Sequence, residues 1–262
     1  MRVVALVLSM FAQLAVSENF ADEIQHETLL APYSAERPKV DGVGNEALWS
    51  IAQWRPLDHS IIGPTPSSED FQGRYKIVWS DEQLHLLVEI VDDVLIDTHP
   101  DPLELYWDDD CLEIFIDADA SGGEHTFSHN AFAYHIALDG NVVDFSPESQ
   151  PPGPALFNDH LDSAWTRDAE RTNTLVWEVS VTLYPDTFKH HYDADESPAE
   201  TLDLSVNKEL GFMLAYCDND GSREREHFMG SHPIKPVNGD RNRGYRDASV
   251  FAPLRLIVGP EK

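Results

Sequence analysis

A tryptophan and a glutamate six residues apart carry the side chains best suited to ligand chemistry in this sequence. Trp107 stands before three consecutive aspartates, and Glu113 lies in the segment CLEIFID at residues 111–117. An indole packs well against the apolar C–H face of a pyranose, and a carboxylate accepts hydrogen bonds from adjacent sugar hydroxyls. Trp107 could equally be a core ring at the rim of a sheet, and the aspartates could be a cation site, a polar rim or solvated charge.

A second candidate region is the loop NGDRNRGYRDASVFAPLRLI at residues 238–257. It contains four arginines, two asparagines and a tyrosine. Loops of this composition commonly cap a domain. This one could also supply a second aromatic ring and neutral hydrogen-bond donors to a polyhydroxylated ligand.

Candidate metal ligands are aspartates and histidines rather than cysteines. The fragment DNDG places Asp218 and Asp220 as in half of a calcium loop. The acidic residue expected later in such a loop is missing, and the fragment also suits a simple turn. His125, His129 and His135 could bind a transition metal, but the first two lie in a turn rich in glycine, serine and asparagine. Two cysteines without a Cys-x-x-Cys pair give no zinc framework.

The charge balance of the chain is strongly acidic. Its 262 residues include 47 acidic and 18 basic side chains, for a formal net charge of −29. This excess argues against nucleic acid or an anionic membrane surface as partner. The 42% hydrophobic content is enough for a full core.

Residues 1–17 are predicted to be a cleaved export signal. They have one basic residue, an apolar run, and small residues at Ala15 and Ser17, and the run falls short of the ~20 residues of a membrane span. No later segment is long and apolar enough to cross a membrane, so we expect a secreted or periplasmic protein. We also expect a monomer. Residues 18–36 are predicted to be a polar lead-in, and residues 37–259 a single domain.

Short segments of alternating polarity predict strands over most of this domain. They span residues 75–80, 84–92, 111–117, 132–138, 141–145, 174–184, 210–218 and 253–259. Tight turns at SDEQ and DG predict two antiparallel hairpins, and 111–117 alternates as a half-buried strand. The pattern favours an all-β antiparallel β-sandwich, immunoglobulin-like or jelly-roll-like, with few short helices. Surface insertions are expected at about 146–165 and 185–208.

Two other functions compete with ligand binding alone. Glu113 with Asp110 or Asp247 could form the carboxylate pair of a glycoside hydrolase, although no second carboxylate has a privileged position in the sequence. His135 or Met213 could be an axial ligand of a haem held between strands, although no haem signature is present.

Four segments in order show that the chain resembles the family 9 carbohydrate-binding modules from about Val40 to Ile257. VDGVGNEALW resembles the family's opening Asp-Gly turn and tryptophan, and YKIVWSDEQLHLLVEIVDD resembles its Trp-Asp hairpin. YWDDDCLEIFID resembles its strand that follows a tryptophan and an acidic run, and NRGYRDASVFAPLRLI resembles its Arg-Asp loop and closing strand. The resemblance implies a β-sandwich that holds a mono- or oligosaccharide between two aromatic rings and serves polysaccharide breakdown or uptake.

Carried over residue by residue, the resemblance implies a specific set of site residues. It places the first ring on Trp107 and the carboxylate on Glu113. It places the second ring on Tyr245, where the best-known binders have tryptophan, and an asparagine on Asn242. The family also binds calcium, which favours the two aspartates of the DNDG fragment as calcium ligands.

Two polar contacts of the family do not carry over. An arginine of its middle strand falls on Tyr134, which we still expect among the carbohydrate-binding residues, and a glutamine of its penultimate strand falls on Ala215. The same matching puts Cys111 beside Glu113 on one face, and Cys217 beside Ala215 on the next strand. The resemblance therefore implies that the two sulfurs lie close together, and we expect a disulfide beneath the sugar platform.

Overall fold

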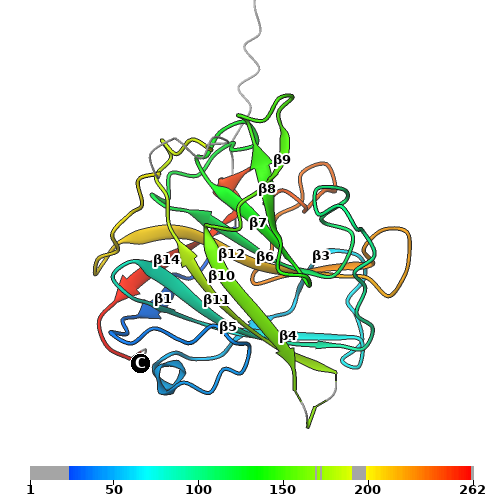
Figure 1. The fold of residues 1–262 in the computed structure, drawn as a ribbon, viewed down its shortest axis with the longest axis horizontal. Helices are drawn as coiled ribbons and strands as arrows, with labels where there is room; N and C mark the ends of the chain where they lie inside the picture. Colours follow the sequence, from blue (N-terminus) through cyan, green and yellow to red (C-terminus); the bar gives the residue numbers. More distant parts are fainter. Residues whose placement is uncertain (1–23, 169, 172, 191–198, 261–262) are drawn as a thin grey trace, which may run out of the picture.

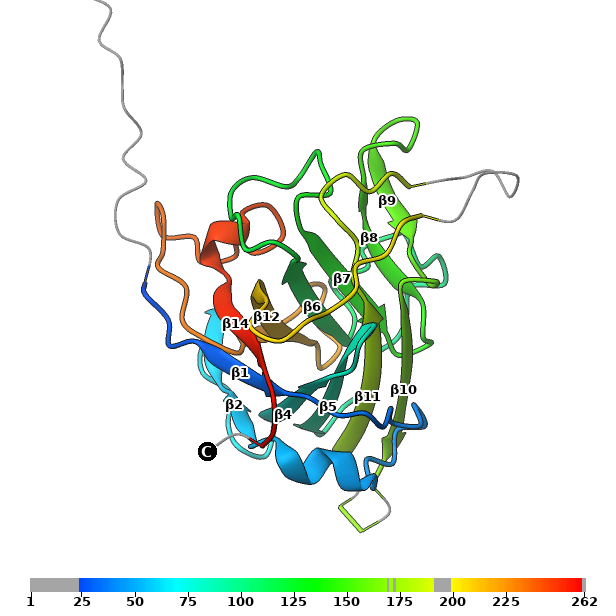
Figure 2. The same cartoon turned by 90° about the vertical axis from the view of Figure 1, so that its left-hand side faces the viewer.

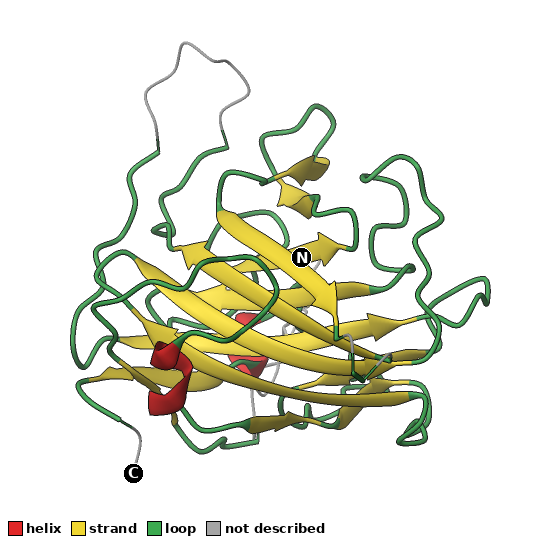
Figure 3. Ribbon diagram, turned by 60° about the horizontal axis from the view of Figure 1, so that its bottom comes forward, coloured by secondary structure: helices red, strands yellow, loops and turns green. Residues whose placement is uncertain are grey.

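The computed structural model describes residues 24–168, 170–171, 173–190 and 199–260, and these residues form a sandwich of two β-sheets (Figure 1). The predicted export signal lies outside the described residues. The described helices are two short 3-10 turns, η1 (Ala47–Ile51) and η2 (Ala248–Val250) (Figure 3). None of the described helices is long and apolar enough to cross a membrane. The predicted all-β sandwich with few short helices is confirmed.

The larger sheet has nine strands. In spatial order its main path consists of β1 (Leu29–Pro32), β14 (Ala252–Ile257), β12 (Glu209–Asp218), β6 (Cys111–Asp117), β7 (Phe132–Ala137), β8 (Val142–Ser146) and β9 (Gly153–Leu156). The other two are β13 (His227–Gly230), which pairs with β12, and β3 (His59–Ile62), which pairs with β13. The pairings are antiparallel except that of β1 with β14, which run parallel at one edge (Figure 2).

The smaller sheet has five antiparallel strands. In spatial order they are β10 (Leu161–Arg167), β11 (Thr174–Thr182), β5 (Gln83–Asp92), β4 (Phe71–Trp79) and β2 (Arg55–Leu57). The β4–β5 and β7–β8 hairpins have the turns that the sequence predicts. Alternate residues of facing strands meet between the sheets in one apolar core, to which β6 contributes Leu112, Ile114 and Ile116 and β11 contributes Leu175, Trp177, Val179 and Val181.

Three expectations differ from the structure. β1 belongs to the sandwich, although its residues were predicted as lead-in, because its few apolar residues pair with the last strand. The insertion predicted near 146–165 contains β9 and most of β10; as an edge strand β10 is largely exposed, so its alternation is weak. β6 is buried on both faces, because residues from the segment before β14, among them Phe251, cover its second face.

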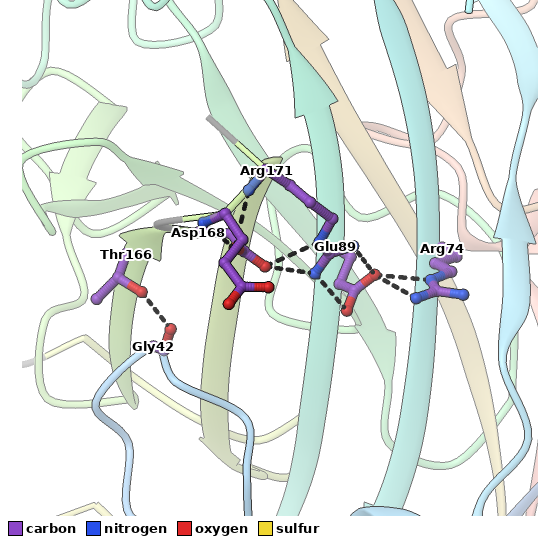
Figure 4. Close-up of polar contacts among 7 residues, drawn as sticks. Gly42, Arg74, Glu89, Thr166, Asp168 and Arg171 are labelled. Atoms are coloured by element: carbon purple, nitrogen blue, oxygen red, sulfur yellow. Dashed lines mark hydrogen bonds and ion pairs between the residues drawn. The ribbon is translucent and has the colours of Figure 1, made fainter. Parts of the chain in front are cut away.

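Charged contacts fasten the outer face of the smaller sheet. Glu89 of β5 accepts hydrogen bonds from Arg74 Nε at 2.8 Å and from Arg171 Nη1 at 3.2 Å (Figure 4). Arg171 also donates to Asp168 at 2.8 Å across the β10–β11 turn. Because these side chains are partly solvated, each pair contributes at most about 1 kcal/mol.

The buried side chain of His160 should make the stability of the protein depend on pH. Burial lowers its pKa to about 3 from 6.5, and its Nδ1 lies 2.8 Å from the Tyr134 hydroxyl. The folded pKa is below the unfolded one, so the stability from neutral His160 is present above pH 6.5 and is lost as the pH falls toward 3. Between about pH 7 and about pH 5 this loss amounts to about 2 kcal/mol.

His160→Gln, which cannot titrate, should therefore lose about 2 kcal/mol less than the parent protein between these two pH values. Urea unfolding of both proteins at each pH measures the difference. An equal loss of stability in the two proteins would contradict the lowered pKa of His160.

Candidate binding site

A pocket of about 430 Å³ opens on the outer face of the larger sheet, away from the core between the sheets. Its lining combines aromatic rings with charged and amide side chains: Tyr106, Trp107, Glu113, Thr126, Ala133, His135, Asp144, Phe145, Arg225, Asn242 and Tyr245. Four residues that the sequence predicts for the site, Trp107, Glu113, Asn242 and Tyr245, are among them. Both large rings are accessible, with Trp107 37% and Tyr245 44% exposed.

Strand register explains which side chains reach this pocket. On β6, Leu112 and Ile114 point to the core, so Glu113 points to the opposite face. Glu113 lies opposite Ala215 of β12 on one side and opposite His135 of β7 on the other. Because the neighbour on β12 is only a methyl group, space remains for groups from the surrounding loops.

Tyr134 does not belong to the site. The tyrosine has the same phase on β7 as Phe132 and Ile136, so it points into the core, where its ring is buried. Its hydroxyl meets His160 there. The next residue, His135, faces the pocket instead. The alternation of apolar residues in FAYHIA at β7 already contained this signal.

Glu113 is a buried, ionised hydrogen-bond acceptor at the pocket floor. Its Oε1 accepts from Arg225 Nη1 at 2.9 Å and from the Cys217 thiol at 2.9 Å, and lies 3.2 Å from His135 Nε2. Burial alone would raise the pKa of Glu113, but the neighbouring His135 and Arg225 lower it to about 2. Oε2 has no hydrogen-bond partner among the described residues, so it is the oxygen that a ligand can use.

Arg225 is a pocket residue that the sequence did not single out. It lies in the connection between β12 and β13, stacks over the Phe228 ring at 4.2 Å, and is 9% exposed. Nη1 is used by Glu113 and Cys217, whereas Nε and Nη2 have no hydrogen-bond partner among the described residues. A guanidinium therefore enters the pocket from a hairpin, although the β7 position that the resemblance assigns to arginine holds a tyrosine.

The three aspartates before β6 hold the loop that carries Trp107. Asp109 accepts hydrogen bonds from the backbone N–H groups of Thr98 and His99. Asp110 accepts from the backbone N–H of Ile96 at 2.6 Å and of Asn219 at 2.8 Å. The Asn219 side chain in turn donates to the Asp108 carbonyl at 2.7 Å. The acidic run thus ties both ends of the loop to each other and to the end of β12.

Tyr106 supports the Trp107 ring from within this loop. Its ring meets Trp107 edge-on at 4.8 Å between centroids, and it meets His135 edge-on at 4.7 Å. Trp107 is therefore positioned by aromatic contacts that reach the pocket floor.

The loop that carries Asn242 and Tyr245 is fixed by a buried arginine. Arg243 donates to Asp247 at 2.6 Å, and Asp247 caps η2 by accepting from the Ser249 backbone N–H at 3.1 Å. Gly244 lies so close to the sheet that a Cβ there would be 2.4 Å from Met213 Cε. The absence of a side chain at position 244 lets the backbone approach the sheet and bring Tyr245 to the pocket.

The two cysteines lie side by side but not as the disulfide that we expected. Cys111 and Cys217 are directly opposite each other in the β6–β12 register, and both are free thiols in the structure. Cys217 donates to Glu113 and accepts from Arg225 Nη1 at 2.8 Å. Burial raises the pKa of both thiols, which keeps them protonated and lets Cys217 act as a donor. The expected proximity is present, and the thiol form gives Glu113 one of its hydrogen bonds.

An acidic cluster lies where β5, β6 and β12 meet. Oxygens of Asp92, Asp110 and Asp218, all buried, come within 4.8 Å of one another. Neither carboxylate oxygen of Asp218 has a hydrogen-bond partner among the described residues. Burial and then the charge of Asp92 raise the pKa of Asp110 and of Asp218 to about 8. An unpartnered carboxylate among like charges fits a cation with oxygen ligands.

Asp220, the second predicted calcium ligand, belongs to a different cluster. Its carboxylate lies within 4.8 Å of those of Asp70 and Asp93, and it is exposed. Asp70 also lies within 4.8 Å of Asp218 and His227, so the two aspartates of the DNDG fragment belong to adjoining clusters, of which one is buried and one is exposed. Asp92 and Asp110 were not predicted as ligands, because sequence spacing does not bring them to Asp218. Asp110 reaches it through the pairing of β6 with β12, and Asp92 reaches it from β5 of the opposite sheet.

The residues considered for glycoside hydrolysis and for haem ligation make other contacts in the structure. Asp110 belongs to the acidic cluster and Asp247 to the loop of Tyr245, so neither lines the pocket with Glu113. Both ring nitrogens of His135 are in contact with protein oxygens, at 2.9 Å from Ala133 and 3.2 Å from Glu113. Met213 is fully buried in the cluster under the loop. The geometry therefore favours neither hydrolysis through these pairs nor haem ligation.

The other predicted transition-metal ligands also have separate partners. His125 Nε2 lies 2.8 Å from the Gly244 carbonyl, and His129 Nε2 lies 2.8 Å from the Glu148 carboxylate. With His135 at Glu113, the three histidines serve three different contacts, and they form no common metal cluster among the described residues.

Comparison with known proteins places these features in a family context. The family model described as carbohydrate family 9 binding domain-like matches residues 40–258. A carbohydrate binding module of family 9 from Caldicellulosiruptor kristjanssonii, solved in complex with cellotriose, is 15% identical with a TM-score of 0.61, over 88% of this chain and 94% of that one. Another structure, a complex with glucose, is 14% identical with a TM-score of 0.62, over 90% and 98%. No curated protein matches the chain.

Proposed function

Because the chain belongs to the carbohydrate family 9 binding domain-like family, we propose that it binds a saccharide without catalysis in the pocket of Trp107, Glu113 and Tyr245. The proposed setting is outside the cytoplasm, since residues 1–17 have the pattern of an export signal. There the protein would serve polysaccharide breakdown or uptake.

One observation carries the proposal: two exposed aromatic rings share a pocket with a fixed set of hydrogen-bonding groups. Trp107 and Tyr245 offer π faces for the apolar side of a pyranose. Glu113 Oε2 accepts from a hydroxyl, Arg225 Nε and Nη2 donate to hydroxyls, and Asn242 can do both. Because Glu113 and Arg225 neutralise each other, the site suits a neutral sugar better than an acidic one.

Isothermal titration calorimetry with glucose and cellotriose tests this function, since relatives of the same fold were solved with these ligands. We expect dissociation constants on the order of micromolar to millimolar, because stacking and a few hydrogen bonds must offset the ordering of both partners. No heat of binding with any mono- or oligosaccharide would refute the proposal.

Recovery of the sugar after the titration distinguishes binding from hydrolysis. Asp144 is a second carboxyl group in the pocket, and burial raises its pKa while that of Glu113 is lowered. Opposite shifts of this kind suit an acid and a base. However, both Asp144 oxygens accept backbone N–H groups, from Ala133 and from Phe145. We therefore expect cellotriose to be recovered unchanged, and its cleavage would favour a hydrolase.

We further propose that calcium occupies the cluster of Asp92, Asp110 and Asp218. The unpartnered carboxylate of Asp218 supports this proposal, because burial without a counter-charge is costly. A bound cation would supply the missing positive charge. Asp110 also holds the loop of Trp107, so the cation would stabilise the first wall of the pocket.

Calcium at about 100 times its dissociation constant should stabilise the protein by about 2.7 kcal/mol relative to chelator. In Asp218→Asn this gain should be lost, while the variant in chelator should be more stable than the parent protein, because a buried carboxyl group whose pKa is raised to about 8 is replaced by an amide that does not ionise. Thermal unfolding with calcium and with chelator measures both effects. Asp220→Asn is the matched control and should keep the calcium response. A parent protein indifferent to calcium would contradict the site.

A further inference from the structure

Beyond Trp107 and Tyr245, a third exposed aromatic side chain lies next to residues that line the pocket. Phe127 is 72% exposed, the largest fraction among the large apolar side chains that the structure describes. Its ring meets that of Phe145 edge-on, with 5.5 Å between centroids. Phe145 lines the pocket, and so does Thr126, the residue before Phe127. The exposed ring is thus continuous with the pocket.

Buried contacts hold the loop of Phe127 in place. His125 and His129, two residues to either side, are both buried and contact Gly244 and Glu148 respectively at 2.8 Å. The His125 N–H also donates to the Arg246 carbonyl at 2.9 Å, next to Tyr245. The loop of Phe127 is therefore bound to the loop of Tyr245, and the ring is presented to solvent from a fixed backbone.

We propose that Phe127 and Phe145 form a second sugar subsite, which takes the next pyranose of a neutral oligosaccharide whose first residue occupies the pocket. This inference rests on the proposed function and extends it to the length of the ligand. Phe127 offers a free face for stacking, and Phe145 joins that face to the pocket. Thr126, the residue before Phe127, lines the pocket, and its hydroxyl donates to the Glu124 carboxylate.

The occupant is a saccharide rather than a protein segment for two reasons. The apolar surface is a single ring flanked by polar side chains, whereas a protein interface needs a wider apolar centre. The ring also continues a pocket that already has aromatic and hydroxyl-binding groups. A monosaccharide would leave the ring uncovered, so the subsite should act only on longer ligands.

Calorimetric titration of the full chain with glucose, cellobiose and cellotriose tests this subsite. In the parent protein, we expect cellotriose to bind about fivefold or more tightly than glucose, because stacking on Phe127 adds to the contacts of the first residue. In Phe127→Ala this preference should disappear while the affinity for glucose stays within about twofold. Phe127→Tyr keeps the ring and should keep the preference. Val258→Ala, which removes another exposed apolar side chain, should change neither value.

Each outcome of the titration is decisive. A preference for cellotriose that survives in Phe127→Ala would overturn the second subsite and leave the proposed function standing. Equal affinity of the parent protein for glucose and cellotriose would do the same. Failure of the parent protein to bind any of the three sugars would overturn the subsite, whereas the proposed function would be overturned only if no other mono- or oligosaccharide binds either.

Discussion

Trp107→Ala is expected to weaken saccharide binding about 10- to 100-fold, which corresponds to about 1.4–2.8 kcal/mol. The indole is the largest accessible ring in the pocket, and its stacking area has no substitute on the same wall. Because Trp107 is 37% exposed, the substitution should change the free energy of unfolding by less than about 1 kcal/mol. Calorimetry with cellotriose and urea unfolding measure the two effects separately.

Trp107→Phe is the matched control for this variant. A phenyl ring keeps part of the stacking face, so its affinity should fall between those of the parent protein and the alanine variant. Tyr245→Ala should also weaken binding if the sugar lies between the two rings. Unchanged binding in Trp107→Ala would exclude stacking on this indole, and unchanged binding in Tyr245→Ala alone would exclude the second ring.

The sequence predicted the sheets well because their signal is local. Alternation in segments such as residues 84–92 and 174–184 reports burial of one face against the opposite sheet, and the strands appear where it is strong. β10 was not predicted, because an edge strand buries few side chains and its sequence therefore shows little alternation of apolar and polar residues. β1 was not predicted, because it is short and pairs with β14, near the opposite end of the chain.

The sequence predicts a residue of the pocket lining where a single strand or motif determines the position of that residue. Trp107 and Glu113 follow from the segment that leads into β6, and Tyr245 follows from the loop before β14. The assignment of Tyr134 failed because it ignored the period of two on β7, which gives the pocket to His135. A count of alternating apolar positions would have corrected it.

Two features of the site depend on contacts between distant elements and have no local signal. Arg225 is one of several arginines in polar segments, and only the turn from β12 to β13 brings it to Glu113. The thiol of Cys217 contacts the same carboxylate across the β6–β12 pairing. Register predicts that Cys111 and Cys217 are neighbours, but it does not predict whether they are thiols or a disulfide.

Glu113→Gln should destabilise the folded protein by about 3 kcal/mol or more, because it removes the anion from a buried guanidinium. Glutamine keeps the shape of the side chain but leaves Arg225, 9% exposed, beside only a neutral thiol and the Phe228 ring. The variant should also bind sugar more weakly, since a neutral amide is a poorer acceptor for hydroxyls. Urea unfolding with an unchanged m-value measures the loss of stability.

A double variant separates the buried charge from a general loss of packing. Glu113→Gln with Arg225→Met removes both charges and should be more stable than Glu113→Gln alone, because no ion is left unpaired. The pH dependence adds an independent test. The pKa of Glu113 is about 2 in the folded protein against 4.5 ordinarily, so its contribution is present above pH 4.5 and fades as the pH falls toward 2. The stability gap between the parent protein and Glu113→Gln should therefore narrow in acid, and a gap that is constant with pH would show that Glu113 acts by packing alone.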